Sequence, residues 1–205
     1  MKRILCFGDS NTWGYAPKQK PIPRLDEESR WTGLLQKKLG SEWKVIEFGL
    51  CGCTSGFANE VHGINVNAHI LYPAVLFANL PVDIVCIMLG TNDLKTTLGW
   101  KSGDTAKNLD LLISTTKSMS PNAKIVLISP IILQKGIENF DGFDKSAVEK
   151  SILCAKEVAD LAYRRKILLF DTNVFIHELC ADGCHFTPAS HKAFGNAMAD
   201  FIVKQ

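Results

Sequence analysis

The fold of this chain is organised around the stretch Phe7-Gly8-Asp9-Ser10-Asn11-Thr12-Trp13-Gly14. A short apolar run, Ile4-Leu5-Cys6-Phe7, leads into it and has the length and composition of a buried strand. The run ends in residues that favour turns and helix starts. A serine at the carboxyl end of such a strand is held by rigid backbone and opens toward the crevice where α/β sheets bind ligands. Ser10 is therefore a candidate functional residue, although serine turns are common and it needs support from elsewhere in the chain.

Beyond this stretch, strand and helix signals alternate along the sequence. Further apolar runs predict strands at residues 45–48, 82–89, 125–128 and 167–170. Helical spacing of apolar residues predicts helices at residues 30–39, 69–80, from Asp104 to about 116, 148–162 and 188–202, with Asp104 and Thr187 as N-caps. Residues 16–29 are polar and proline-rich, and we expect them to run over the surface. The alternation predicts an α/β fold in which helices cover both faces of a parallel sheet.

Composition restricts the class of protein further. With 205 residues, 46% of them hydrophobic, we expect a single domain spanning residues 1–205. The net charge is +2 and no basic run occurs, so nucleic acid is not an expected partner. The apolar runs are too short for a signal peptide or a membrane span. We therefore expect a soluble, cytoplasmic protein with no membrane partner.

The cysteines and histidines near the C-terminus raise the question of a metal site. The seven cysteines are odd in number and mostly lie among apolar residues, which favours reduced, buried thiols. Five candidate metal ligands lie close together in this region: His177, Cys180, Cys184, His185 and His191. Their spacing matches no common zinc pattern. We expect no metal and no cofactor.

Polar and glycine-bearing segments follow several of the predicted strands. Ser10 follows the first strand, Gly52 the second, Gly90-Thr91-Asn92-Asp93 the third and Asp182-Gly183-Cys184-His185 the fifth. Because the carboxyl ends of parallel strands lie at one edge of a sheet, these segments should converge there.

These segments resemble the four sequence blocks of the SGNH (GDSL-type) hydrolases, in the same order and at typical separations. The resemblance implies a flavodoxin-like, three-layer α/β/α sandwich with a five-stranded parallel sheet, and serine esterase chemistry. Residues 8–15, 30–33 and 182–187 are similar to the arylesterase and acyltransferase branch, whose members act on short-chain esters and tend to be oligomers. Asn11 replaces the leucine of the name-giving pattern, and we interpret this change as lying outside the chemistry.

The residue types fit ester hydrolysis on chemical grounds as well. Ser10 would attack the ester carbonyl if a base accepted its proton, and His185 is the candidate base. Asp182, three residues earlier, could bond the far ring nitrogen and fix the tautomer. The backbone N–H groups of Ser10 and Gly52 and the amide of Asn92 would hold the oxyanion. Taken alone, Asp182-Gly183 and Asn92 also fit ordinary turns.

Several other residues have two possible interpretations. Trp13 and Tyr15 are either pocket-lining or core residues. We interpret Asp9 and Asp93 as structural carboxylates that bond loop backbone. The remaining histidines are expected on the surface or in packing: His62, His69, His177 and His191.

The predicted function is a cofactor-independent serine esterase acting on small, mainly acetyl, esters. Acyl transfer to alcohols or peroxide shares the same acyl-enzyme and remains an alternative, as does a catalytically silent carbohydrate-binding module. Residues 16–29 and 55–81 are longer than connections in a minimal α/β domain. The second segment contains the apolar residues Ile64, Val66, Ile70, Leu71 and Tyr72. We expect a homo-oligomer in which these segments form contacts and narrow the pocket mouth.

Overall fold

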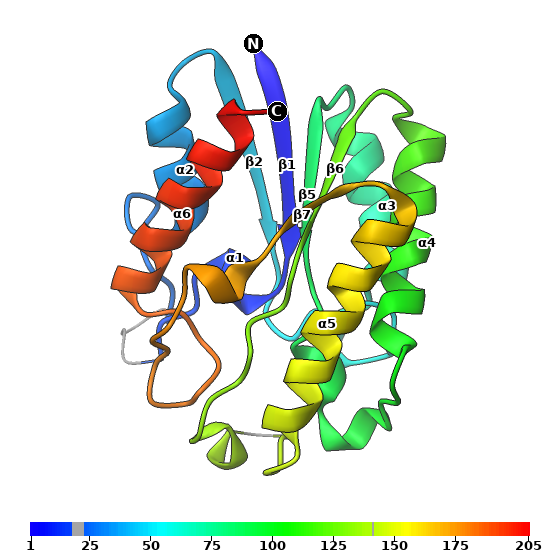
Figure 1. Cartoon of the computed structure of the whole chain (residues 1–205), viewed down its shortest axis with the longest axis vertical. Coiled ribbons are helices and arrows are strands. Elements are labelled where there is room, and N and C mark those ends of the chain that lie inside the picture. The colour runs from blue at the N-terminus through cyan, green and yellow to red at the C-terminus, as the bar shows by residue number, and fades with distance from the viewer. Residues whose placement is uncertain (18–22, 141) are drawn as a thin grey trace.

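A five-stranded parallel sheet forms the centre of the computed structural model, which describes residues 1–17, 23–140 and 142–205 (Figure 1). In spatial order its strands are β2 (Trp43–Gly49), β1 (Lys2–Gly8), β5 (Ile84–Met88), β6 (Lys124–Ile128) and β7 (Leu168–Phe170). Every residue of β5 is buried, because this strand lies mid-sheet and is covered on both faces. The predicted parallel sheet is confirmed.

Helices cover both faces of the sheet and give three layers (Figure 1). On one side α2 (Trp31–Leu39) packs against α6 (Pro188–Val203). On the other, α4 (Asp104–Met119) packs between α3 (Ala68–Asn79) and α5 (Ala147–Arg165). The short elements lie in the connections: α1 (Ser10–Trp13), η1 (Asn92–Leu94), η2 (Thr96–Leu98), η3 (Ile137–Asn139) and η4 (Thr172–Val174).

One of the two predicted helix caps is confirmed and the other is corrected. Thr187 caps α6, because its hydroxyl accepts a hydrogen bond from the N–H of Ser190 at 3.1 Å. At α4 the cap is Gly103, and Asp104 is already the first helical residue. The carboxylate of Asp104 instead accepts from the N–H of Lys101 at 2.8 Å, which closes the turn before the helix.

The long connection at residues 55–81 contains a small antiparallel pair, β3 (Glu60–Val61) with β4 (Ile64–Asn65), followed by α3 where a helix was predicted. Its apolar residues divide between core and surface. Val66 and Tyr72 are buried, whereas Ile64 and Ile70 are exposed. In the proline-rich segment before α2, residues 18–22 lie outside the described residues.

The described part of the chain contains no helix that is long and apolar enough to cross a membrane. No disulfide joins any two of the seven cysteines, all of which lie in the described ranges. Five of these are buried and two, Cys51 and Cys180, are partly exposed.

Candidate active site

Ser10 is placed by the abrupt change from β1 to α1. The strand ends at Gly8, and Asp9 caps the short helix by accepting from the N–H of Asn11 at 2.9 Å. Ser10 is therefore the first residue of α1 and is 6% exposed. Figure 1 shows α1 at the carboxyl edge of the sheet, at the far end of β1 from the N-terminus.

The segment after β7 brings a histidine to this serine. His185 Nε2 lies 2.9 Å from Ser10 Oγ, and its Nδ1 lies 2.8 Å from Asp182 Oδ2. The structure brings these three residues together at the carboxyl edge of the sheet. The arrangement can pass a proton from the hydroxyl to the ring while the carboxylate stabilises the ring that accepts it.

Asp182 also holds the backbone of its own turn. Its Oδ1 accepts from the N–H groups of Cys184 and His185, each at 3.0 Å. Burial acts to raise the pKa of Asp182, but the hydrogen bond and charge of His185 and the two N–H groups outweigh it, so the pKa falls to about 2. The carboxylate is therefore ionised at neutral pH, as its bond to a ring N–H requires.

The second predicted group of residues lies after β2 and β5. Cys53 N donates to Leu50 O at 3.0 Å, which closes a turn with Gly52 at φ +78°. A Cβ at position 52 would also come within 2.7 Å of Val61 Cγ2, so only glycine fits this turn without strain. Asn92 is 7% exposed and its Nδ2 donates to Cys53 O at 3.1 Å, which ties its amide to the same turn.

Two backbone donors at this edge have no acceptor among the described residues. Within residues 1–17, 23–140 and 142–205, neither the N–H of Ser10 nor that of Gly52 donates a hydrogen bond to another group. The side-chain amide of Asn92 carries two hydrogens, of which one serves Cys53 O. Donors without an acceptor at a site are available to an anionic oxygen.

The carboxylates of Asp9 and Asp93 bond loop backbone, as predicted. Asp93 is fully buried and accepts from the N–H of Ser55 at 2.8 Å and from the hydroxyls of Ser55 and Thr105. Burial raises the pKa of both Asp9 and Asp93 to about 6. Neither carboxylate is bonded to His185, whose carboxylate partner is Asp182.

Aromatic rings flank the imidazole of His185. The Tyr15 ring centroid lies 4.4 Å from that of His185, and Phe140 meets the same ring edge-on at 5.4 Å. Trp13 lies one ring further away, 6.5 Å from Tyr15, with the Arg24 guanidinium over its face. The structure thus brings Tyr15 to the site directly and Trp13 only behind it. Phe140 was not predicted, because it lies in a long connection with no motif around it.

A polar network centred on Glu47 of β2 fixes the chain that follows α1. Its carboxylate binds the guanidinium groups of Arg24 and Arg30 and accepts from the Thr32 hydroxyl. Arg24 also donates to Trp13 O at 2.8 Å, and Arg30 donates to a backbone carbonyl of the same segment. The network holds the segment that carries Tyr15 in place, and no local pattern in the sequence indicated it.

Of the histidines predicted to be structural, His191 is the most deeply buried. Its Nδ1 accepts from the N–H of Trp31 at 3.3 Å, and burial lowers its pKa to about 3, so the ring is neutral. The described ranges contain no group of three or more His, Cys, Asp or Glu residues arranged to hold a metal ion.

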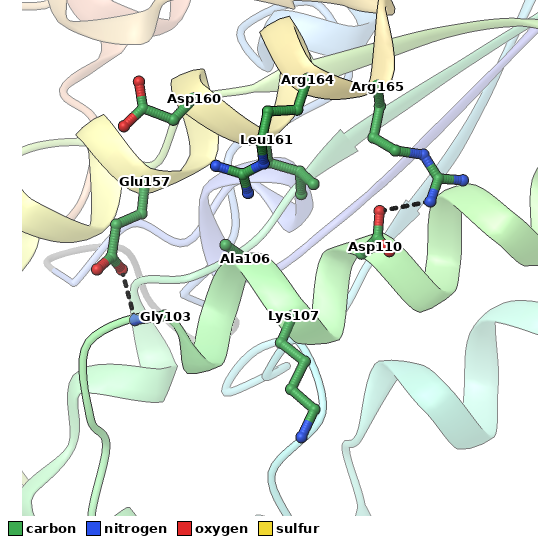
Figure 2. Close-up of a pocket in the computed structure, with 9 residues that line it drawn as sticks. All are labelled: Gly103, Ala106, Lys107, Asp110, Glu157, Asp160, Leu161, Arg164 and Arg165. Carbon is green, nitrogen blue, oxygen red and sulfur yellow. Dashed lines mark hydrogen bonds and ion pairs between the residues drawn. The ribbon is translucent and has the colours of Figure 1, made fainter.

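Several cavities lie outside the Ser10–His185 contact. One, of about 440 Å³, lies between α4 and α5, and Figure 2 shows Glu157 reaching the N–H of Gly103 and Arg165 paired with Asp110 across it. These contacts join the two helices, and we interpret the cavity as a packing groove. A second cavity, of about 600 Å³ and mostly apolar, borders Asp182 and Phe186.

The geometry agrees with comparisons to known proteins. The chain belongs to the GDSL-like lipase/acylhydrolase family, whose model matches residues 6–193. An aryl esterase from M. smegmatis is 32% identical with a TM-score of 0.89, and the match covers 100% of this chain and 99% of that one. A carbohydrate acetylesterase from Sinorhizobium meliloti is 28% identical with a TM-score of 0.91, at the same coverage. No curated protein matches the chain. The predicted fold family and the class of carboxylic ester hydrolases are confirmed.

Proposed function

We propose that this protein is a serine esterase that hydrolyses short-chain esters, chiefly acetyl esters, through an acyl-enzyme. The observation that carries the proposal is the hydrogen-bonded series from Ser10 Oγ through His185 to Asp182, at 2.9 and 2.8 Å. Such a series activates a hydroxyl that is otherwise a weak nucleophile.

The first half of the reaction forms the acyl-enzyme. Ser10 Oγ attacks the ester carbonyl while its proton passes to His185 Nε2, and the ring then protonates the departing alkoxide. Asp182 stabilises the imidazolium through Nδ1. In the second half a water attacks the acyl group, His185 takes its proton and returns it to Ser10 Oγ, and the carboxylic acid leaves.

The charge that develops on the carbonyl oxygen needs donors that are fixed in advance. The free N–H groups of Ser10 and Gly52 and the second amide hydrogen of Asn92 are the donors that we propose. Gly52 is held in place by its turn, and Asn92 by its bond to Cys53 O, so neither has to reorganise as the charge builds.

Restricted access to the Ser10 hydroxyl supports a preference for esters with small acyl groups. Ser10, Asn92 and His185 are 6%, 7% and 2% exposed, and Tyr15 and Phe140 lie against the imidazole. The relative described as a carbohydrate acetylesterase supports the same acyl size. The near burial of the serine also favours acyl transfer as a second activity, because an alcohol bound in such a site competes well with water.

The proposal is tested with p-nitrophenyl esters of increasing acyl length, followed by acetylated sugars. We expect hydrolysis to be fastest for the acetyl ester and to fall steeply with chain length. Ser10→Ala should abolish hydrolysis and labelling by a fluorophosphonate, whereas Ser114→Ala, at an exposed serine of α4, should change neither. Adding an alcohol and measuring the new ester against the free acid gives the share of acyl transfer.

Two results would contradict the proposal. Brisk hydrolysis of long-chain esters would refute the restriction to short acyl groups. A folded wild-type protein that neither hydrolyses esters nor reacts with the fluorophosphonate would refute the esterase itself and favour a binding module.

A further inference from the structure

Asn11, the residue directly after Ser10, is bonded to the segment that carries the base. It is the second residue of α1 and is 3% exposed, so its carboxamide faces protein rather than solvent. Its Nδ2 donates to the carbonyl of Cys184 at 3.1 Å, and its Oδ1 accepts from the N–H of Phe186 at 2.9 Å. The two partners are the residues on either side of His185.

This pairing fixes the backbone of His185 relative to the nucleophile. One planar carboxamide supplies both a donor and an acceptor, and it binds the chain before and after His185 as a neighbouring strand would. Among the described residues, the only other hydrogen bond between α1 and residues 182–186 is the one between Ser10 Oγ and His185 Nε2.

Most other bonds of the segment lie within its own turn, and one bond, from the N–H of Gln134 to the carbonyl of Gly183 at 2.9 Å, joins it to the connection after β6. Asp182 Oδ1 binds the N–H groups of Cys184 and His185, and the N–H of Cys180 donates to the carbonyl of His185. These bonds shape the turn and orient the imidazole toward Asp182. None of these bonds reaches α1, so the Asn11 carboxamide is the link between the backbone of this turn and the helix that carries Ser10.

We infer that Asn11 is a positioning residue that holds His185 at bonding distance from Ser10. The inference rests on the proposed esterase mechanism and corrects our interpretation that the departure from leucine lies outside the chemistry. Leucine can form neither bond. Since the name-giving family pattern has leucine here, an Asn11→Leu variant keeps a side chain that the fold accepts and removes only the carboxamide.

The chain offers a matched control at Asn173, in the η4 turn after β7. Its Oδ1 accepts from the N–H of Ile132 at 2.8 Å, and its Nδ2 donates to the carbonyl of Pro130 at 3.2 Å. Asn173 therefore binds the residues on either side of Ile131, as Asn11 binds the residues on either side of His185. No catalytic group lies between the two partners of Asn173. Asn173→Leu removes the same pair of bonds, and also those from Nδ2 to Ser129 Oγ and Asp171 Oδ1, none of which involves α1.

The experiment compares both variants with wild type on p-nitrophenyl acetate, per folded molecule. We expect Asn11→Leu to lower kcat by ten- to about 100-fold with KM changed less than twofold, because small displacements of a catalytic group cost rates of this order. Fluorophosphonate labelling of Ser10 should slow by a similar factor. Asn173→Leu should lower the melting temperature and leave kcat within twofold. Asn11→Asp, which keeps the acceptor for Phe186 N–H, should recover part of the loss.

A double-mutant cycle identifies the group through which Asn11 acts. In a His185→Ala background, Asn11→Leu should have little further effect on the residual rate, since the base that it positions is gone. Multiplicative losses would show that Asn11 acts on Ser10 or the oxyanion donors, and would overturn the inference. So would an Asn11→Leu variant as active as Asn173→Leu.

Amide hydrogen exchange tests whether Asn11 holds the segment around His185 without relying on esterase activity. Asn11→Leu should speed exchange at Phe186 and not at Ile132, and Asn173→Leu should do the reverse. If wild type shows no activity that depends on Ser10, the esterase proposal fails. The exchange rate at Phe186 then decides whether Asn11 holds the segment, and an unchanged rate would refute that too.

Discussion

Asn92 is the site residue whose functional and structural roles are easiest to separate by mutation. If its amide donates to the oxyanion, the bond strengthens as charge builds on oxygen, so its loss should lower kcat rather than raise KM. We expect Asn92→Ala to lower kcat about 10²–10³-fold, or ~3–4 kcal/mol, with KM little changed. Steady-state kinetics and a melting temperature measured on one sample test this.

The competing role predicts a different pair of results. Asn92 also ties η1 to the turn after β2 through Cys53 O. A variant that melts earlier but keeps its activity per folded molecule would show that this tie is its whole function. It would remove Asn92 from the proposed oxyanion hole.

The residues that could be predicted from the sequence are those whose signal is local. Ser10 and Asn92 follow buried strands directly, and Asp182 and His185 share one turn, so a short motif marks each. Asn11 lies next to Ser10 in the sequence, but its hydrogen-bond partners lie 173 and 175 residues away. No spacing rule connects residues that far apart, so the role of Asn11 could not be predicted. Phe140 and Glu47 likewise acquire their roles only through packing between distant segments.

At the scale of elements, Asp93 joins the segment after β2 to α4 through Ser55 and Thr105. Burial raises its pKa from 3.8 to about 6, so the folded state holds its proton more tightly than the unfolded chain does. Its contribution to folding is therefore greatest below about pH 4 and is lost as the pH rises through about 6.

Asp93→Asn should remove this pH dependence, because the amide does not ionise. Relative to wild type, the free energy of unfolding of the variant should increase between pH 4 and pH 7, by up to ~3 kcal/mol. The loss of hydrogen bonds changes the free energy of unfolding of the variant by the same amount at every pH. Asp9 titrates in the same pH range, but it is present in both proteins and its effect cancels in the comparison. Denaturant unfolding at intervals across this range provides the measurement, and parallel curves would contradict the expectation.

Long elements were predicted well because their apolar periodicity is strong. α2, α4, α5 and α6 and the five strands of the sheet all lie where the pattern placed them, within a few residues. The β3–β4 pair escaped prediction because each strand has two residues, too few to show alternation. The cap of α4 was misplaced by one residue, since Asp104 can bond the turn before the helix as well as the helix itself.

At the scale of the whole molecule, the strand order β2-β1-β5-β6-β7 is that of a flavodoxin-like sheet, which the family resemblance implied and which the apolar pattern alone does not specify. The predicted homo-oligomer remains a proposal. Its structural support is an exposed apolar surface on α3 and β4, where Ile64, Ile70 and Phe77 are 52%, 58% and 72% exposed.

We expect light scattering at micromolar concentration to give a mass that is a multiple of the 22.6 kDa chain. Charged substitutions at the exposed apolar surface, Ile70→Glu with Phe77→Glu, should shift the protein toward monomer. Tyr163→Glu, at an 87% exposed position on α5, serves as the control. A monomeric wild type at this concentration would count against the oligomer.

The network around Glu47 has a consequence for how this sequence can change over time. Arg24 and Arg30 share one carboxylate, so the effect of replacing any of the three depends on which of them are still present. Loss of Glu47 first would leave two partly buried guanidinium groups without the carboxylate that they share. Loss of one arginine first leaves a working ion pair. The order of substitutions is therefore constrained, and homologous chains should lose an arginine before, or together with, the glutamate.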